Sequence, residues 1–177
     1  MAACGRAIGR HGPGFTLAQV AAAAGVGVGT VAGRFGSKHG LMNAMMTTTT
    51  AHLAERMRVA AARQRDPVEA VLAAARVVTD GVADPAETTN HLAQLGVDMS
   101  DPQLRAGLAA LRAEVRTVLR DLLATADLPA APPPARAARI IAALANGTTL
   151  DWSIDPSGTL ATRLRADLRA VLDAWRG

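Results

Sequence analysis

The residues that could do chemistry in this chain are few and scattered. The four histidines, His11, His39, His52 and His91, show no metal-ligand spacing such as His-x-x-x-His. The single cysteine, Cys4, has no nearby base in the sequence that could activate its thiol. No glycine-rich phosphate loop follows a strand-like segment. The sequence therefore predicts no enzyme activity, no metal site and no cofactor.

Basic side chains gather in the first third of the chain. Residues 1–65 contain eight arginines and lysines and one acidic residue, Glu55, although the whole chain carries a net charge of only +4. Positive charge confined to one part predicts a polyanionic partner, such as DNA, for that part alone. The alternative from charge alone is a solvated basic surface.

The elements that must position these side chains are helices. Half of the residues are hydrophobic but only 2% are aromatic, and alanine and leucine, which favour helix, dominate. Asp-Pro pairs that begin at Asp66 and Asp84 have the cap-and-proline pattern of helix starts. We predict an all-α fold of about nine helices, at roughly 2–11, 17–24, 28–34, 38–64, 67–82, 86–98, 102–126, 135–154 and 158–176.

Residues 16–31 are the most informative stretch. A capping box, Thr16-x-x-Gln19, begins a short helix, and Gly25 supplies the positive φ of the tight turn that ends it. A second short helix follows, and Phe35-Gly36-Ser37-Lys38 leads into a longer third one. Two short helices joined in this way form a helix-turn-helix, whose second helix enters the major groove of DNA.

This stretch closely resembles the DNA-binding domain of the TetR (tetracycline-repressor) family of bacterial transcription regulators. The family pattern Ser-x-Gly-Thr-apolar-Tyr-x-(His or Tyr)-Phe is matched at Gly29, Thr30, Val31 and Phe35. The resemblance implies phosphate contacts from Thr16, Thr30 and Lys38, while Val28 faces the groove and could meet a thymine methyl group. The predicted DNA-binding residues are Thr16, Gly27, Val28, Gly29, Thr30, Gly33, Arg34 and Lys38.

The chain departs from the family pattern at four positions. Ala32 replaces a phosphate-binding tyrosine, a contact that Arg34 could partly restore. Gly27 replaces the cap serine, Gly33 weakens the second helix by about 1 kcal/mol relative to alanine, and Gly40 replaces the glutamate of a further capping box. Met1 also begins almost inside the first helix, without the basic extension usual in the family. We therefore expect weaker operator binding than in its relatives.

The resemblance further implies a DNA-binding domain at residues 1–45 and a ligand-binding and dimerisation domain at residues 46–177. TetR-like proteins pair their last two helices with a second copy in a four-helix bundle. Apolar stripes on both predicted helices fit this role, although the pattern alone would equally serve an intramolecular core. The predicted dimer-interface residues are Ile141, Trp152, Leu164, Leu168, Val171 and Trp175.

The middle helices are expected to enclose a modest aliphatic cavity for an unknown small-molecule effector. Its candidate polar contacts are His91, Gln94 and Asn146, although a lone polar residue on a helix is more often at the surface or already hydrogen-bonded. No apolar run approaches the roughly 18–20 residues of a membrane span, and one cysteine fits a reducing compartment. The chain is predicted to be soluble and cytoplasmic.

The sequence as a whole predicts a ligand-responsive repressor that binds a palindromic operator in double-stranded DNA as a homodimer. The alternative is a helical small-molecule-binding protein with weakened or lost DNA binding. Salt-dependent binding to duplex DNA would separate the two.

Overall fold

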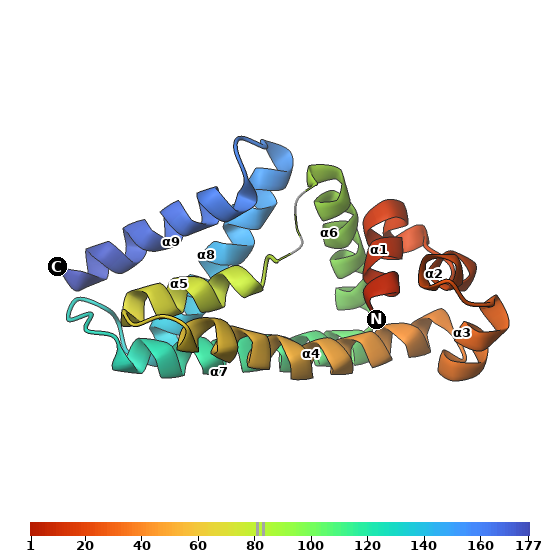
Figure 1. The fold of residues 1–177 in the computed structure, drawn as a ribbon, viewed down its shortest axis with the longest axis horizontal. Coiled ribbons are helices and arrows are strands. Elements are labelled where there is room, and N and C mark those ends of the chain that lie inside the picture. Colours follow the sequence, from red (N-terminus) through yellow and green to blue (C-terminus); the bar gives the residue numbers. More distant parts are fainter. Residues whose placement is uncertain (81, 83) are drawn as a thin grey trace. The chain divides into compact units, whose positions relative to one another are not determined.

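The computed structural model describes residues 1–80, 82 and 84–177. These residues form nine α-helices, one short 3-10 helix and no strand, which confirms the predicted all-α fold (Figure 1). The elements are α1 (Ala2–His11), η1 (Gly12–Gly14), α2 (Leu17–Ala24), α3 (Val28–Phe35), α4 (Lys38–Ala62), α5 (Pro67–Val77), α6 (Pro85–Ser100), α7 (Pro102–Thr125), α8 (Pro134–Ile154) and α9 (Leu160–Arg176).

The predicted aspartate caps begin α5 and α6. At α5, Oδ1 of Asp66 accepts hydrogen bonds of 2.7 and 3.0 Å from the amides of Val68 and Glu69. Asp84 accepts two such bonds at the start of α6. A carboxylate in this position satisfies amides that have no partner within the first turn, and a proline at the first helical position loses no hydrogen bond there.

Asp101 connects three helices. It follows the last residue of α6, and its Oδ1 accepts hydrogen bonds of 2.9 Å from the amides of Gln103 and Leu104 at the start of α7. Its Oδ2 lies 3.3 Å from Nε2 of His39 on α4. The hydrogen bond from Leu104 is the largest cause that lowers the pKa of the Asp101 carboxyl. Asp101 therefore ends α6 through its extended backbone and begins α7 through its side chain.

Two of the differences from the predicted helix ranges have a clear local cause. The sequence predicts a helix up to residue 82, but α5 ends at Val77 because the next amides bond to carbonyls three residues earlier, which tightens the last turn. Residue 81 of that predicted range lies outside the described residues. At the other end of the chain, α9 begins at Leu160 and not at 158, because Gly158 has a φ of 64° and Thr159 caps the helix.

The chain divides into two compact units, each with its own core. The first comprises residues 1–50 and 84–111, and in it α6 packs against α1. The second comprises residues 51–83 and 112–177, and in it α9 folds back against α8 and also contacts α5 (Figure 1). The boundary between the units falls within α4 and α7. The functional boundary expected at residue 45 rests on different grounds and stays a prediction.

Candidate functional site

The helix-turn-helix is built by local interactions that the sequence predicts. Oγ1 of Thr16 accepts a hydrogen bond of 3.3 Å from the amide of Gln19, and the amide of Thr16 donates one of 2.8 Å to Oε1 of Gln19. The capping box is therefore complete. At the other end of α2, Gly25 adopts the left-handed conformation, with a φ of 69°, and closes the helix. This turn sets the direction of α3.

The N-terminal end of α3 presents an open face to solvent. Val31 is buried and anchors the helix in the core of its unit, whereas Val28 is 52% exposed. Thr30 and Arg34, which are also predicted DNA contacts on α3, are exposed as well. The three glycines of this region, Gly27, Gly29 and Gly33, are exposed too. A Cβ atom built at Gly29 or Gly33 meets no atom within 4 Å. The face can therefore approach a flat or grooved partner closely.

Electrostatics around α1, α2 and α3 favour an anionic partner. The first 54 residues contain no aspartate or glutamate. Arg6 and Arg10 line a shallow hollow of about 240 Å³ between α1 and α2, together with His11 and Gln19. Arg6 also donates a hydrogen bond of 2.6 Å to the carbonyl of Ala23, near the end of α2. Our sequence reasoning did not single out these two arginines, although the uneven distribution of charge pointed to their region.

Lys38, a predicted phosphate contact, is half-buried. Its Nζ donates a hydrogen bond to the carbonyl of Pro13 and lies 4.1 Å from the centroid of the Phe15 ring. An ammonium group has three donors, so this one bond leaves two for another acceptor. Lys38 therefore ties the start of α4 to η1, a structural role that the sequence did not indicate.

Gly40 has a steric reason to be glycine. The amide of Gly40 donates a hydrogen bond of 3.0 Å to Oγ of Ser37, so half of the capping box at this helix start is present. A Cβ atom at residue 40 would collide with the carbonyl oxygen of Phe35. The glutamate that the family pattern has here would therefore need a different backbone path between α3 and α4.

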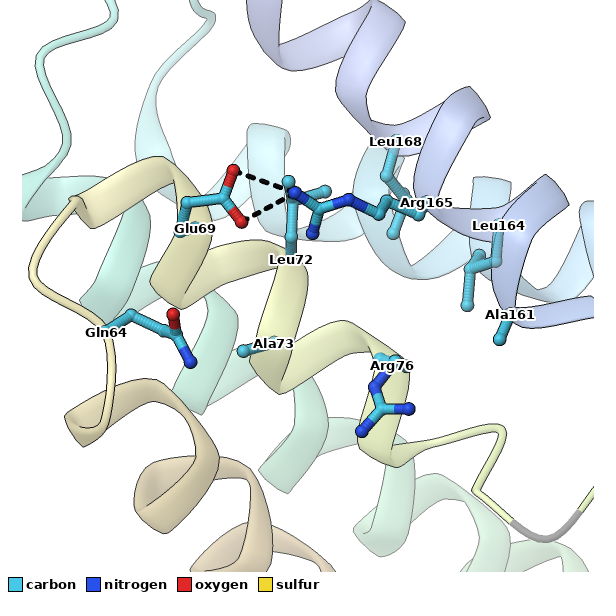
Figure 2. Close-up of a pocket in the computed structure, with 9 residues that line it drawn as sticks. All are labelled: Gln64, Glu69, Leu72, Ala73, Arg76, Ala161, Leu164, Arg165 and Leu168. Carbon is cyan, nitrogen blue, oxygen red and sulfur yellow. Dashed lines mark hydrogen bonds and ion pairs between the residues drawn. The ribbon is translucent and has the colours of Figure 1, made fainter.

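A second candidate site is a groove between α5 and α9 with a volume of about 180 Å³ (Figure 2). Arg165 reaches across from α9 and donates hydrogen bonds of 3.0 and 2.9 Å to the two oxygens of Glu69 on α5. Arg169 also pairs with Glu69. The residues that line the groove are Gln64, Glu69, Leu72, Ala73, Arg76, Ala161, Leu164, Arg165 and Leu168.

The residues predicted to contact a ligand lie elsewhere. Gln94 is buried on α6, where it donates a hydrogen bond to Asp98. His91, on the same helix, lies against α1 at Gly9, and burial lowers its pKa. Asn146 on α8 is exposed and donates to the carbonyl of Ala142. None of the three lines the α5–α9 groove, and their role as ligand contacts stays a prediction.

The predicted dimer residues are buried to different degrees within the second unit. Ile141, Trp152, Leu164 and Leu168 are at most 3% exposed within a single chain. The stripe on α9 continues through Leu172 into the core of the same unit, while Val171 and Trp175 are half-buried against that core. Within a single chain these four side chains are buried, as the intramolecular alternative of the sequence analysis expects. The role of the six residues in a dimer interface stays a prediction.

Among the described residues, no group of three or more histidine, cysteine, aspartate or glutamate side chains is placed to hold a metal ion. Across the same part of the chain, no helix is long and apolar enough to cross a membrane.

A capped helix-turn-helix at the N-terminus, followed by a larger helical body, defines a helix-turn-helix transcriptional regulator. Residues 2–45 match the family model for bacterial regulatory proteins of the tetR family. Residues 77–176 match the model for the C-terminal part of BetI-type transcriptional repressors. The chain belongs to the TetR family, as its sequence resemblance predicted.

Solved structures share the fold. A transcriptional regulator from Rhodococcus sp. Rha1 has a TM-score of 0.75 at 22% identity, over 99% of this chain and 95% of that chain. The fatty acid degradation regulator FadR from Bacillus halodurans has a TM-score of 0.75 at 15% identity, over 97% and 95%. Thermus thermophilus FadR, a TetR-family transcriptional repressor in complex with lauroyl-CoA, has a TM-score of 0.57 at 25% identity, over 97% and 92%. The comparison with curated proteins found no match.

Proposed function

We propose that this protein is a ligand-responsive repressor that works in the cytoplasm and binds a palindromic operator as a homodimer, through residues 16–38. The observation that carries the proposal is the open N-terminal end of α3, where Val28 is exposed beside three glycines while Val31 holds the helix in place. Small residues let the backbone approach base edges, and an exposed valine suits a thymine methyl group. Regulation rather than catalysis is the role that this arrangement supports.

A homodimer is supported by an apolar stripe on the outward side of α8. Its large members are exposed by 37% at Ile140, 46% at Leu150 and 74% at Ile154. With the small residues Ala143 and Gly147, they recur at intervals of three and four, the spacing along which two helices pack. The neighbouring helix α9 exposes Ala166, Ala170 and Ala174. A second copy related by a two-fold axis would cover this face, because in such a dimer the same patch of each subunit packs against its counterpart.

Two observations favour the alternative, a ligand-binding protein with weakened DNA binding. The ammonium group of Lys38 is engaged by Pro13 and Phe15, so a phosphate must share it. Ala32 offers no hydroxyl at the position where family members carry a tyrosine.

Selection from random duplex DNA tests the proposal. We expect enrichment of a palindrome whose half-sites lie about one helical turn apart, roughly 34–36 Å. The affinity should fall steeply with salt, because bound phosphates release counterions. If no palindrome is enriched and the chain binds all duplexes with the same low affinity, the alternative function replaces the repressor.

A further inference from the structure

We propose that α8 pairs with α8 of a second copy in an antiparallel orientation, and that opposite charges at the two ends of the helix select this orientation. The inference rests on the proposed homodimer and adds the orientation, the register and the ion pairs of its interface. The occupant of the apolar stripe on α8 is therefore a second copy of this chain.

The charges on α8 oppose its own helix dipole. Arg136 lies in the first turn of α8 and Asp151 in the last turn. Arg139 and Asp155 add a second charge of the same sign near each end. Helix ends are stabilised by the reverse order, with acidic side chains at the N-terminus and basic ones at the C-terminus. Within a single chain, this distribution of charge is unfavourable.

These four charges have no partner within one chain. All four residues are exposed, and none forms an ion pair among the described residues. They cannot neutralise one another along the helix, because Arg139 and Asp151 lie about 18 Å apart at about 1.5 Å per residue. A partner from outside the chain is needed to compensate them.

The charges lie on and beside the apolar stripe of α8. Extended by one turn toward the N-terminus, the stripe recurs at intervals of four and three residues and passes through Arg136, Ile140, Ala143, Gly147, Leu150 and Ile154. This spacing is that of a seam along which two helices pack. Asp151 directly follows Leu150 and so borders the seam. A helix that covers the stripe must therefore also meet the charges.

The middle of the stripe is self-complementary in an antiparallel pair. If Ala143 lies level with Gly147 of the second copy, small residues meet at the centre and the two backbones can approach closely. Ile140 then lies level with Leu150 of the second copy, and the two-fold axis repeats both contacts. The large apolar side chains are therefore covered on both sides of a small-residue centre.

The charged ends meet their opposites in the same register. Arg139 lies level with Asp151 of the second copy, and Arg136 lies level with the end of that helix, beside its Asp155. Each charge also faces the helix end whose dipole it complements. A parallel copy would instead place arginine beside arginine and aspartate beside aspartate, which like-charge repulsion disfavours. The charges therefore favour the antiparallel pair.

Charge-reversed variants test the orientation. One double variant carries Arg136→Glu with Arg139→Glu, and the other carries Asp151→Arg with Asp155→Arg. Both changes follow the order that the helix dipole prefers, so each chain should fold, which circular dichroism verifies. Each variant alone brings like charges together in the antiparallel pair. We therefore expect sedimentation equilibrium to give a dimer dissociation constant higher by about tenfold or more.

A chain with all four substitutions is the decisive variant. It joins opposite charges again in the antiparallel pair, so its dimer dissociation constant should return close to that of the unaltered chain. Arg112→Glu with Arg116→Glu changes the charge by the same amount at two exposed positions of α7. This control should leave the dimer unchanged.

The proposal is overturned if the double variants dimerise like the unaltered chain, if the fourfold variant does not regain the dimer, or if the α7 control weakens the dimer as much. Dimers that do not respond to these charges would keep the proposed homodimer and remove its antiparallel orientation. An unaltered chain that sediments as a monomer would remove both. Selection from duplex DNA tests operator binding separately.

Discussion

Gln94 donates a hydrogen bond of 2.7 Å from Nε2 to Oδ1 of Asp98, and both side chains are buried on α6. The amide oxygen of Gln94 has no hydrogen-bond partner within the described residues. Burial is the largest cause of the shift and raises the pKa of Asp98, and the negative charge of Asp101 raises this pKa further. The hydrogen bond from Gln94 and the positive charge of Lys38 lower the pKa and so oppose this shift. The first unit thus holds a carboxyl group whose charged form is disfavoured by burial.

We therefore expect Asp98→Asn to increase the free energy of unfolding at neutral pH by about 1–2 kcal/mol. Asparagine removes a buried charge, and its amide can donate to the unpaired oxygen of Gln94. A folded-state pKa above the unfolded value means that the folded chain binds more protons in that window. The stability of the unaltered protein then falls as pH rises from about 4 through the raised pKa, and the advantage of the variant grows.

Urea denaturation over a pH series measures this difference. Asp127→Asn removes an exposed carboxylate and serves as the control, with a small and nearly constant effect. A stability difference for Asp98→Asn that does not change with pH would show that the buried carboxyl is not the cause.

Two glycine substitutions should have opposite effects on stability. Gly33→Ala places its methyl group in open space on α3 and should stabilise the fold by about 0.5–1 kcal/mol, because alanine favours helix. Gly40→Ala meets the carbonyl of Phe35 and should destabilise it by about 1–3 kcal/mol, as overpacking does. Chemical denaturation compares the two. Equal effects of the same sign would contradict the backbone geometry between α3 and α4.

Arg34 should contribute to DNA binding mainly through charge. Arg34→Gln removes one exposed cation from α3, so we expect weaker binding to every duplex and a salt slope lower by about 1. Fluorescence anisotropy at several salt concentrations gives both quantities. Arg112→Gln makes the same change of charge on α7 and should leave the slope nearly unchanged. If the two variants behave alike, α3 is not the element that faces the phosphates.

The outward face of α8 should control the oligomeric state. Replacing Ile140 and Leu150 by glutamate places charges on exposed positions, so each chain should still fold while the proposed dimer separates. Sedimentation velocity measures the mass in solution, and circular dichroism verifies that helix is retained. Leu164→Glu with Leu168→Glu is the contrasting pair. It should unfold the second unit, because both leucines are buried in its core.

A folded double variant at Ile140 and Leu150 that still sediments as a dimer would place the interface elsewhere. Val59→Glu, an exposed apolar position on α4, is the matched control and should leave the mass unchanged.

The sequence predicted the helices well because their ends depend on neighbours in the chain. The caps at Thr16, Asp66 and Asp84 and the turn at Gly25 need only residues within one helical turn, and each is present. The end of α5 was missed because it depends on a tightened last turn without a strong breaker at that point. Periodicity showed that α9 has one apolar face, but it could not tell an intramolecular core from an interface.

The sites were harder to predict because they join residues far apart in sequence. Glu69 and Arg165 are 96 residues apart, and neither carries a motif. The stripe on α8 was overlooked because alanine and glycine fill two of its five positions. Lys38 was predicted as a phosphate contact, and that role stays a prediction. Its contact with Pro13 depends on where η1 lies, and no local pattern gives that position.

The junction at Asp101 limits where residues can be inserted into the chain or deleted from it. The same residue ends α6, and its carboxylate begins α7 and reaches His39, so no spare residue separates the two helices. One inserted residue would turn α7 by about 100° about its own axis. Leu104, now in the core of the first unit, would swing toward solvent. Homologous chains that keep this core should therefore vary in length elsewhere and conserve the spacing between α6 and α7.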